Sequence, residues 1–224
     1  MYSSIGGYGT HSPLLRQLVK NTNGNIIEFG CGDNSTTVIR ESIKGTDRIL
    51  ITFESNKVWY DKYKHFADNN HFIYYVPTSN DDNDIVGDFW VKHALSILKS
   101  HNIEFDICFI DQSPWTARTC VLQHFKNVCK YLIVHDVDYF PRNNKWGKVL
   151  ESKKIDYNKK IYNMVFDDIL RCHKIFYPKL EYFCPKTGPP TLLGSNLLEK
   201  SEFDNKCNEL ENKTNDYYNF SYFD

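Results

Sequence analysis

An apolar segment that runs directly into two closely spaced glycines indicates how this chain begins to fold. Residues 26 to 36 read Ile-Ile-Glu-Phe-Gly-Cys-Gly-Asp-Asn-Ser-Thr, which predicts a buried strand followed by a tight loop and a helix. Gly30 and Gly32 lack a Cβ, so the backbone can turn sharply and come close to a ligand. The hydroxyl groups of Ser35 and Thr36 suit the first turn of the helix. The segment therefore predicts a cofactor-binding loop at the end of a strand.

The spacing of these glycines separates two kinds of cofactor. A dinucleotide-binding loop has the pattern G-x-G-x-x-G, whose third glycine lets the helix pack closely under a pyrophosphate. Ser35 occupies that third position, so the loop suits a ligand without a pyrophosphate. Glu28 adds a carboxylate two residues before the first glycine. An ordinary tight turn after a strand is the alternative interpretation.

The rest of the chain alternates between predicted strands and helices. After a helix over residues 11–20, strands are predicted at 25–29, 48–54, 71–76, 105–111 and 131–136, with helices at 35–44, 57–67, 89–100 and 115–129. Five strands, each followed by a helix or loop, predict an α/β fold whose mostly parallel sheet is covered on both faces. Residues 174–177 and 191–194 are candidates for late strands. We expect one domain over residues 1–198 and a polar tail over residues 199–224 that is either a frayed helix or disordered.

Composition narrows the class of protein. The 224 residues carry a net charge of −1, so they lack the basic excess of a protein that binds nucleic acid. The seven cysteines form no C-x-x-C pair, which argues against a zinc site or a disulfide framework and favours a reducing compartment. Neither a signal-peptide pattern nor an apolar stretch of membrane-spanning length is present. We therefore expect a soluble, cytoplasmic protein that does not associate with membranes. The sequence does not indicate its oligomeric state.

Polar residues fall at the predicted strand ends, where the ligand crevice of an open parallel sheet lies. Glu54 ends the second strand, 24 residues after Gly30, and is followed by Ser55. From this position a carboxylate can accept both hydroxyl groups of a ribose, although a solvated acid at a strand end is the simpler alternative. The acids after the third strand either meet an adenine amino group or belong to a turn: Asp81, Asp82 and Asp84.

The fourth and fifth strands end in a second group of polar residues. Carboxylates that directly follow an apolar strand need a partner, which would be a positively charged cofactor group or a divalent metal. The candidate ligands for Mg²⁺ or Mn²⁺ are Asp111, Asp136 and Asp138. His135 can accept a proton from a hydroxyl nucleophile, with Asp111 and Asp136 as competitors and a structural role as the alternative. Adjacent strand residues point to opposite faces, so His135 and Asp136 share a site only where the strand has broken up.

These motifs, in this order, resemble those of the class I S-adenosylmethionine-dependent methyltransferases over about residues 8–140. The resemblance rests on Glu-Phe-Gly-Cys-Gly at 28–32, on Glu54, on Phe-Ile-Asp-Gln-Ser-Pro-Trp at 109–115 and on Val-His-Asp at 134–136. More narrowly, Asp-Gln-Ser-Pro-Trp-x-Ala-Arg, His-Asp-x-Asp-Tyr-Phe and the segment 187–196 are similar to a smaller group of methyltransferases. The resemblance implies a Rossmann-like fold and S-adenosyl-L-methionine as the cofactor.

The resemblance also implies which residues bind the cofactor: Glu28, Gly30, Gly32, Asn34, Ser35, Thr36, Glu54, Ser55, Asp111, Gln112 and Ser113. The chain departs from the broader family at Asn34, which stands where a third glycine often lies. It also lacks the Asn-Pro-Pro-Tyr type of motif that nucleic-acid amino-methylating enzymes carry after the fourth strand. This second departure favours a hydroxyl oxygen, on a small molecule or a sugar, as the methyl acceptor.

The acceptor pocket is expected from segments outside the sheet, with Tyr8, His11, Trp115, Arg118 and Tyr139 as its candidate residues. Aromatic side chains and a few polar groups suit a sugar or a phenolic ring equally well. Two other functions fit the same strands and loop. One is a nicotinamide-dependent oxidoreductase, and the other is a catalytically inactive cofactor-binding module.

Overall fold

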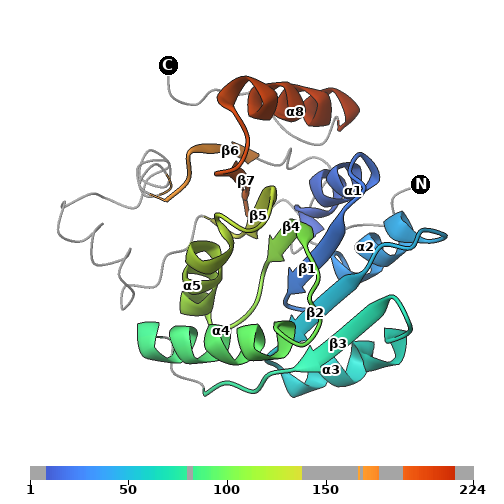
Figure 1. Ribbon diagram of the computed structural model, residues 1–224, viewed down its shortest axis with the longest axis vertical. Helices are drawn as coiled ribbons and strands as arrows, with labels where there is room; N and C mark the ends of the chain where they lie inside the picture. Colours follow the sequence, from blue (N-terminus) through green and yellow to red (C-terminus); the bar gives the residue numbers. More distant parts are fainter. Residues whose placement is uncertain (1–8, 80–82, 138–165, 167–168, 177–188, 215–224) are drawn as a thin grey trace.

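The computed structural model describes residues 9–79, 83–137, 166, 169–176 and 189–214, which form a seven-stranded mixed sheet with helices on both faces (Figure 1). The five predicted strands are present as β1 (Asn25–Phe29), β2 (Leu50–Glu54), β3 (His71–Tyr75), β4 (Phe105–Ile110) and β5 (Tyr131–His135). The two candidate late strands are present as β6 (Cys172–Phe176) and β7 (Thr191–Ser195). The predicted positions of all these strands are therefore confirmed to within a few residues.

The strand order is β3-β2-β1-β4-β5-β7-β6. Neighbouring strands from β3 to β5 are parallel, whereas β7 is antiparallel to both β5 and β6. The chain moves outward from β1 to β3 and then returns to the other side of β1 with β4. This reversal places a crevice at the carboxyl ends of β1 and β4, where open α/β sheets bind ligands. The predicted doubly wound, mostly parallel α/β sheet is confirmed.

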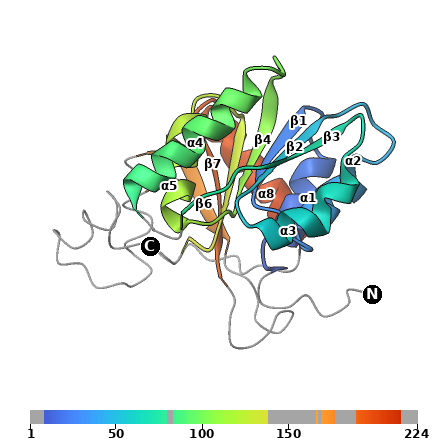
Figure 2. The same ribbon diagram turned by 90° about the horizontal axis from the view of Figure 1, so that it is seen from below.

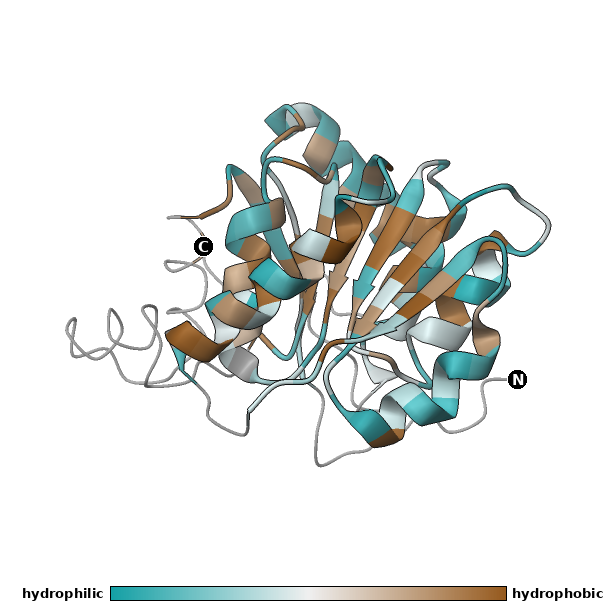
Figure 3. Ribbon diagram, turned by 60° about the horizontal axis from the view of Figure 1, so that its bottom comes forward, coloured by the Kyte–Doolittle hydropathy of each residue, from teal (hydrophilic) through white to brown (hydrophobic). Residues whose placement is uncertain are grey.

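Helices cover the sheet because its central strands are apolar on both faces. On one face Ile27 and Phe29 of β1 join a core cluster with the helices α4 (Asp84–Leu98) and α5 (Trp115–Phe125). On the other face Ile26 packs in a cluster with α1 (Ser12–Lys20) and α2 (Thr36–Ile43). Figure 2 shows these two layers on either side of the sheet, and Figure 3 shows the apolar strands at its centre.

Two helices differ from their predicted bounds. Helix α4 begins at Asp84, five residues before the predicted start, because the Asn83 side chain accepts the Val86 N–H at 3.1 Å and caps the helix. This cap lies in a segment that is polar enough to predict a turn. Helix α3 (Lys57–Tyr63) ends early and continues as a 3₁₀ turn over Lys64–Phe66.

Of the two forms expected for the segment after residue 199, a frayed helix or a disordered tail, the structure shows a helix, and this helix is packed against the domain. Residues Lys200–Lys213 form helix α8, whose Phe203, Cys207 and Leu210 are buried in the cluster that also contains α1. These three residues are spaced by four and three positions, so they lie on one side of an otherwise polar helix. Among the described residues, no helix is both long and apolar enough to cross a membrane.

Candidate active site

Gly30 follows β1 with a φ of +97°, a backbone conformation that favours glycine. A Cβ at this position would lie 2.8 Å from the carbonyl oxygen of Asp111 and 2.9 Å from the backbone nitrogen of Gln112. The sequence predicts that Gly30 makes room for a ligand, whereas the structure shows that it makes room for the backbone after β4. At Gly32 the atom nearest to a Cβ is the Ser35 hydroxyl oxygen, at 3.1 Å. A side chain at Gly32 would therefore clash less with the rest of the protein than one at Gly30.

Glu28 lies beneath the loop and is fully buried. Its carboxylate accepts hydrogen bonds from the hydroxyl groups of Thr36, at 3.0 Å, and Thr52, at 2.8 Å. The Thr36 oxygen in turn accepts the Gly32 N–H at 2.9 Å. Burial raises the pKa of Glu28 to about 8, although hydrogen bonds from Ser35, Thr52 and Thr36 act in the opposite direction. Glu28 therefore supports the loop through Thr36, and its direct contact with a cofactor stays a prediction.

Glu54 joins the tip of β2 to the glycine loop. Its carboxylate accepts the backbone N–H groups of Cys31 and Asn56, each at 2.6 Å. Burial raises the pKa of Glu54, and the backbone hydrogen bonds oppose this effect. Each carboxylate oxygen has a further lone pair, so the arrangement is compatible with the predicted contact to a ribose. The neighbouring Ser55 donates to the Ser113 carbonyl at 2.6 Å and connects β2 to the tip of β4.

Gln112 carries an unpaired polar group next to the loop. The residue is 1% exposed, and neither its amide oxygen nor its amide nitrogen has a hydrogen-bond partner within the described part of the chain. A buried amide without partners costs about 1–3 kcal/mol. This position was predicted to bind the cofactor, and the unpaired amide is the type of group that a bound ligand would satisfy.

The tips of β4 and β5 bring Asp111, His135 and Asp136 together. Strand β5 ends at His135, and Asp136 has a φ of +52°, so the two side chains no longer alternate between faces of the sheet. The Nδ1 atom of His135 lies 3.2 Å from Asp111 Oδ1 and 3.3 Å from Asp136 Oδ1. The sequence makes a shared site conditional on a break in the strand, and the structure meets that condition.

Arg118 of α5 connects both carboxylates. Its guanidinium lies 2.9 Å from Asp111 Oδ1 and 3.1 Å from Asp136 Oδ2, and it also donates to the carbonyls of Gln112 and His135, both at 2.9 Å. Sequence reasoning placed Arg118 in the acceptor pocket. The structure instead shows Arg118 holding the strand tips together, and its contact with an acceptor stays a prediction.

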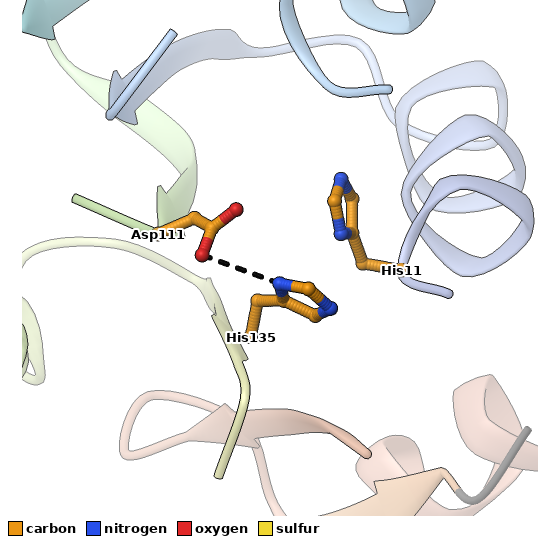
Figure 4. Close-up of side chains that lie close together, drawn as sticks. All are labelled: His11, Asp111 and His135. Carbon is orange, nitrogen blue, oxygen red and sulfur yellow. Dashed lines mark hydrogen bonds and ion pairs between the residues drawn. The ribbon is translucent and has the colours of Figure 1, made fainter. Parts of the chain in front are cut away.

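His11 is the second imidazole at the strand tips. The residue is 2% exposed, its ring centroid lies 4.3 Å from that of His135, and neither ring nitrogen makes a hydrogen bond among the described residues. Burial and His135 lower the pKa of His11 to about 3, and Asp111 and the Asn34 backbone oppose this only in part. Burial alone would raise the pKa of Asp111, but His135, Arg118 and His11 together hold it well below its ordinary value. Figure 4 shows the side chains of His11, Asp111 and His135 facing one another.

Thr10 is a site residue that sequence reasoning missed. Its hydroxyl group lies 3.0 Å from His135 Nε2 and donates to the carbonyl of Pro189 at 2.7 Å. Thr10 belongs to the segment before α1 that was expected near the acceptor. However, no signal in the sequence indicates which strand tip that segment contacts.

Several predicted site residues lie outside the described residues, and nothing further is established for them: Tyr8, Asp81, Asp82, Asp138 and Tyr139. The side chain of Trp115 is likewise not described. Of the three aspartates predicted as ligands for Mg²⁺ or Mn²⁺, Asp111 and Asp136 are paired with Arg118. Because the third of them, Asp138, lies outside the described residues, the magnesium site stays a prediction.

A surface cavity of about 590 Å³ lies at the opposite edge of the sheet, at the amino ends of β2 and β3. Its charged lining residues are paired in part, since Arg40 lies 3.0 Å from Asp68 and 3.2 Å from His71 Nδ1. None of the residues that line this cavity belongs to the strand-tip site described above. We therefore do not assign the chemistry to the cavity.

Comparison with solved structures identifies the fold. The O-methyltransferase from Bacillus cereus in complex with SAH matches with a TM-score of 0.50 and 13% identity, covering 83% of this chain and 78% of that chain. The chain has the Rossmann-like fold of the class I methyltransferases. Spermidine synthase in complex with the transition-state analogue AdoDATO also matches, with a TM-score of 0.50, 12% identity and coverage of 93% and 65%. No protein-family model and no curated protein sequence matches the chain.

Proposed function

We propose that this protein is an S-adenosylmethionine-dependent methyltransferase that methylates a hydroxyl oxygen of a small molecule or a sugar. The observation that carries the proposal is the buried, unpaired amide of Gln112 beside a glycine loop. A glutamine amide offers one donor and one acceptor side by side, which complements the N6 and N7 edge of adenine. The group therefore suits the adenosyl part of the cofactor.

The other residues around the loop fit the same cofactor. Glu54 would hold the ribose with the lone pairs that its two backbone hydrogen bonds leave over. Gly32 offers a backbone surface with little side-chain cover, next to Asn34, Ser35 and Thr36. Ser35 replaces the glycine that a dinucleotide needs under its pyrophosphate, which supports S-adenosylmethionine over a nicotinamide cofactor.

The acceptor side would lie at the tips of β4 and β5. When bound, S-adenosylmethionine supplies an activated methyl group on a positively charged sulfur. Transfer to a hydroxyl then requires that the two reactants be held in line and that one proton be removed. Asp111, His135 and Asp136 are the groups at these tips that can accept this proton, and Arg118 and Thr10 hold them in place.

An oxygen acceptor is supported by the residues after β4. Asp111 is followed by Gln-Ser-Pro-Trp rather than by the Asn-Pro-Pro-Tyr type of motif that characterises amino-methylation of nucleic acids. The net charge of −1 also speaks against a phosphate-backbone substrate. The two fold relatives are named as an O-methyltransferase and a spermidine synthase, so the fold alone does not choose the reaction.

Calorimetric titration with S-adenosylhomocysteine tests the proposal. Gln112→Ala should raise the dissociation constant about five- to 150-fold, because contacts of this kind contribute about 1–3 kcal/mol. Gln123→Ala, which makes the same change within α5, is the matched control and should bind like the wild type. Binding of NADH in place of S-adenosylhomocysteine would support the oxidoreductase instead. Failure of the folded wild type to bind either compound would support the inactive module.

A further inference from the structure

His11 has a feature that binding of S-adenosylmethionine does not explain. The residue is 98% buried, yet neither of its ring nitrogens makes a hydrogen bond of good geometry with the described residues, the Asn34 backbone being close enough only to act weakly on the ring. It packs between Phe109, at a centroid distance of 4.9 Å, and His135, at 4.3 Å. Buried imidazoles with a purely structural role normally hydrogen-bond through at least one nitrogen. Ring nitrogens of His11 that no described residue satisfies are therefore suited to a bound ligand.

The neighbours of His11 suggest what this ligand is. One nitrogen of His11, one nitrogen of His135 and one carboxylate oxygen of Asp111 all lie within 4.8 Å of one another (Figure 4). The three residues come from the start of α1 and from the tips of β4 and β5. Ligand atoms around one metal ion lie up to about 4 Å apart, since each bond is about 2.0–2.2 Å long. Small side-chain rotations would bring all three onto one ion.

The hydrogen bond at Nε2 of His135 is compatible with a metal ion at its other nitrogen, Nδ1. In the tautomer that a metal at Nδ1 requires, His135 Nε2–H donates to the Thr10 oxygen, and the Thr10 hydroxyl can still donate its own proton to the Pro189 carbonyl. The neutral imidazole then has its lone pair on Nδ1, which lies 3.2 Å from Asp111 Oδ1. Two such lone pairs repel each other unless a cation or a proton lies between them. Metal-bound histidines typically donate their other N–H to an oxygen atom, as His135 does here.

A proton on Nδ1 is the alternative, and it explains less. It would form an ion pair between His135 and the carboxylates of Asp111 and Asp136. That ion pair leaves both nitrogens of His11 without a role. Among the described residues at these strand tips, two carboxylates face one guanidinium, that of Arg118, which leaves one excess negative charge when the imidazoles are neutral. This excess charge favours a divalent cation.

Arg118 does not block such a cation. Its guanidinium and His135 both contact Oδ1 of Asp111. Since both of these contacts fall on Oδ1, the second oxygen, Oδ2, is the atom of Asp111 that a metal would use. Asp111 can therefore keep Arg118 on one oxygen and bind a metal through the other.

We propose that His11, Asp111 and His135 bind one divalent first-row transition-metal ion. Two imidazole nitrogens and one carboxylate suit Zn²⁺, Co²⁺ or Fe²⁺ better than Mg²⁺, which prefers oxygen ligands. Three protein ligands leave coordination positions open, as in catalytic metal sites. The proposal rests on the geometry of these side chains and does not depend on the binding of S-adenosylmethionine.

Titration of the metal-free protein with Co²⁺ and Zn²⁺ tests this site. We expect one equivalent of Co²⁺ to give visible absorption bands, and one equivalent of Zn²⁺ to abolish them, whereas Mg²⁺ at the same concentration should not. His11→Ala should weaken binding by at least about a hundredfold, since loss of a supporting residue alone costs about 10–100-fold. His93→Ala, which removes an exposed imidazole from α4, is the matched control.

Thr10→Val provides a second variant that keeps all three ligands. It should weaken Zn²⁺ binding by about 10–100-fold because His135 loses its orienting partner. Absence of stoichiometric Co²⁺ and Zn²⁺ binding by the folded wild type would overturn the proposal, as would unchanged binding in both variants. S-adenosylhomocysteine is titrated into the same metal-free sample. Metal binding without S-adenosylhomocysteine binding would refute the methyltransferase alone, and the reverse would refute the metal site alone.

Discussion

Replacing Glu28 by glutamine should stabilise this protein, and by more as the pH rises. Glu28 is fully buried in β1, and burial raises its pKa from 4.5 to about 8. Between these two values the folded protein holds a proton that the unfolded chain has released, so folding must take up a proton. The contribution to stability is complete below pH 4.5 and is lost as the pH rises to about 8.

The size of the effect follows from the width of this interval. Each pH unit between the two pKa values costs about 1.4 kcal/mol of folding free energy. At pH 7, 2.5 units above 4.5, Glu28 therefore makes folding less favourable by about 3 kcal/mol than at pH 4. The amide of Glu28→Gln resembles the protonated carboxyl and can still bond with Thr36 and Thr52. We expect the variant to match the wild type near pH 4 and to exceed it by about 2–3 kcal/mol at pH 7.

Urea unfolding of both proteins from about pH 4 to 8.5 measures this difference. In a domain of this size each kcal/mol also shifts Tm by about 2–4 °C, so thermal unfolding provides an independent check. Glu41→Gln, at an exposed carboxylate of α2, controls for the exchange of a carboxylate for an amide. A stability difference that does not change with pH would refute the reasoning. A Glu28→Gln variant that is less stable at pH 8 than the wild type would show that Glu28 stabilises the fold as a charged group.

Two further substitutions test the packing around the strand tips. Gly30→Ala should destabilise the fold by about 2–4 kcal/mol in urea unfolding, because the added Cβ combines a positive φ with a contact of 2.8 Å to the Asp111 carbonyl. An alanine variant of wild-type stability would contradict this placement of the backbone. Arg118→Met should lower stability by about 3–5 kcal/mol, because it leaves the carboxylates of Asp111 and Asp136 without their shared cation. Arg118→Lys should recover part of that loss, and equal thermal stability of the methionine variant and the wild type would show that the ion pairs contribute little.

Local pattern was sufficient for most of the fold. The apolar runs that become β1, β2 and β4 are short and bounded by polar residues or glycine. Their positions therefore follow from the local order of residues. The packing of helix α8 against the domain was not predicted, because its apolar residues Phe203, Cys207 and Leu210 are few and stand among charged residues. Their burial depends on the apolar surface that α1 offers, which the sequence of α8 does not describe.

For the site, the sequence indicated which residues would lie near one another, and their roles stay predictions. It placed Asp111, His135 and Asp136 at neighbouring strand tips, and the structure shows them in contact. Arg118 was expected to face an acceptor, but it pairs with two of these groups. The sequence around Arg118 does not indicate which carboxylates the side chain will contact. Asp111 and Asp136 come close to it only after the sheet has formed.

The sequence by itself determined strand β1, the glycine loop that follows it and the order of the helices and strands. These features depend on local periodicity and on backbone conformation. Tertiary structure alone decided that Thr10 meets His135 and that His11 meets Asp111 and His135, across 100 or more positions of chain. It also decided that Gly30 is required by the backbone after β4. The physical reason is that burial, pairing of charges and close backbone contact are properties of neighbours in space, and a linear pattern contains no record of them.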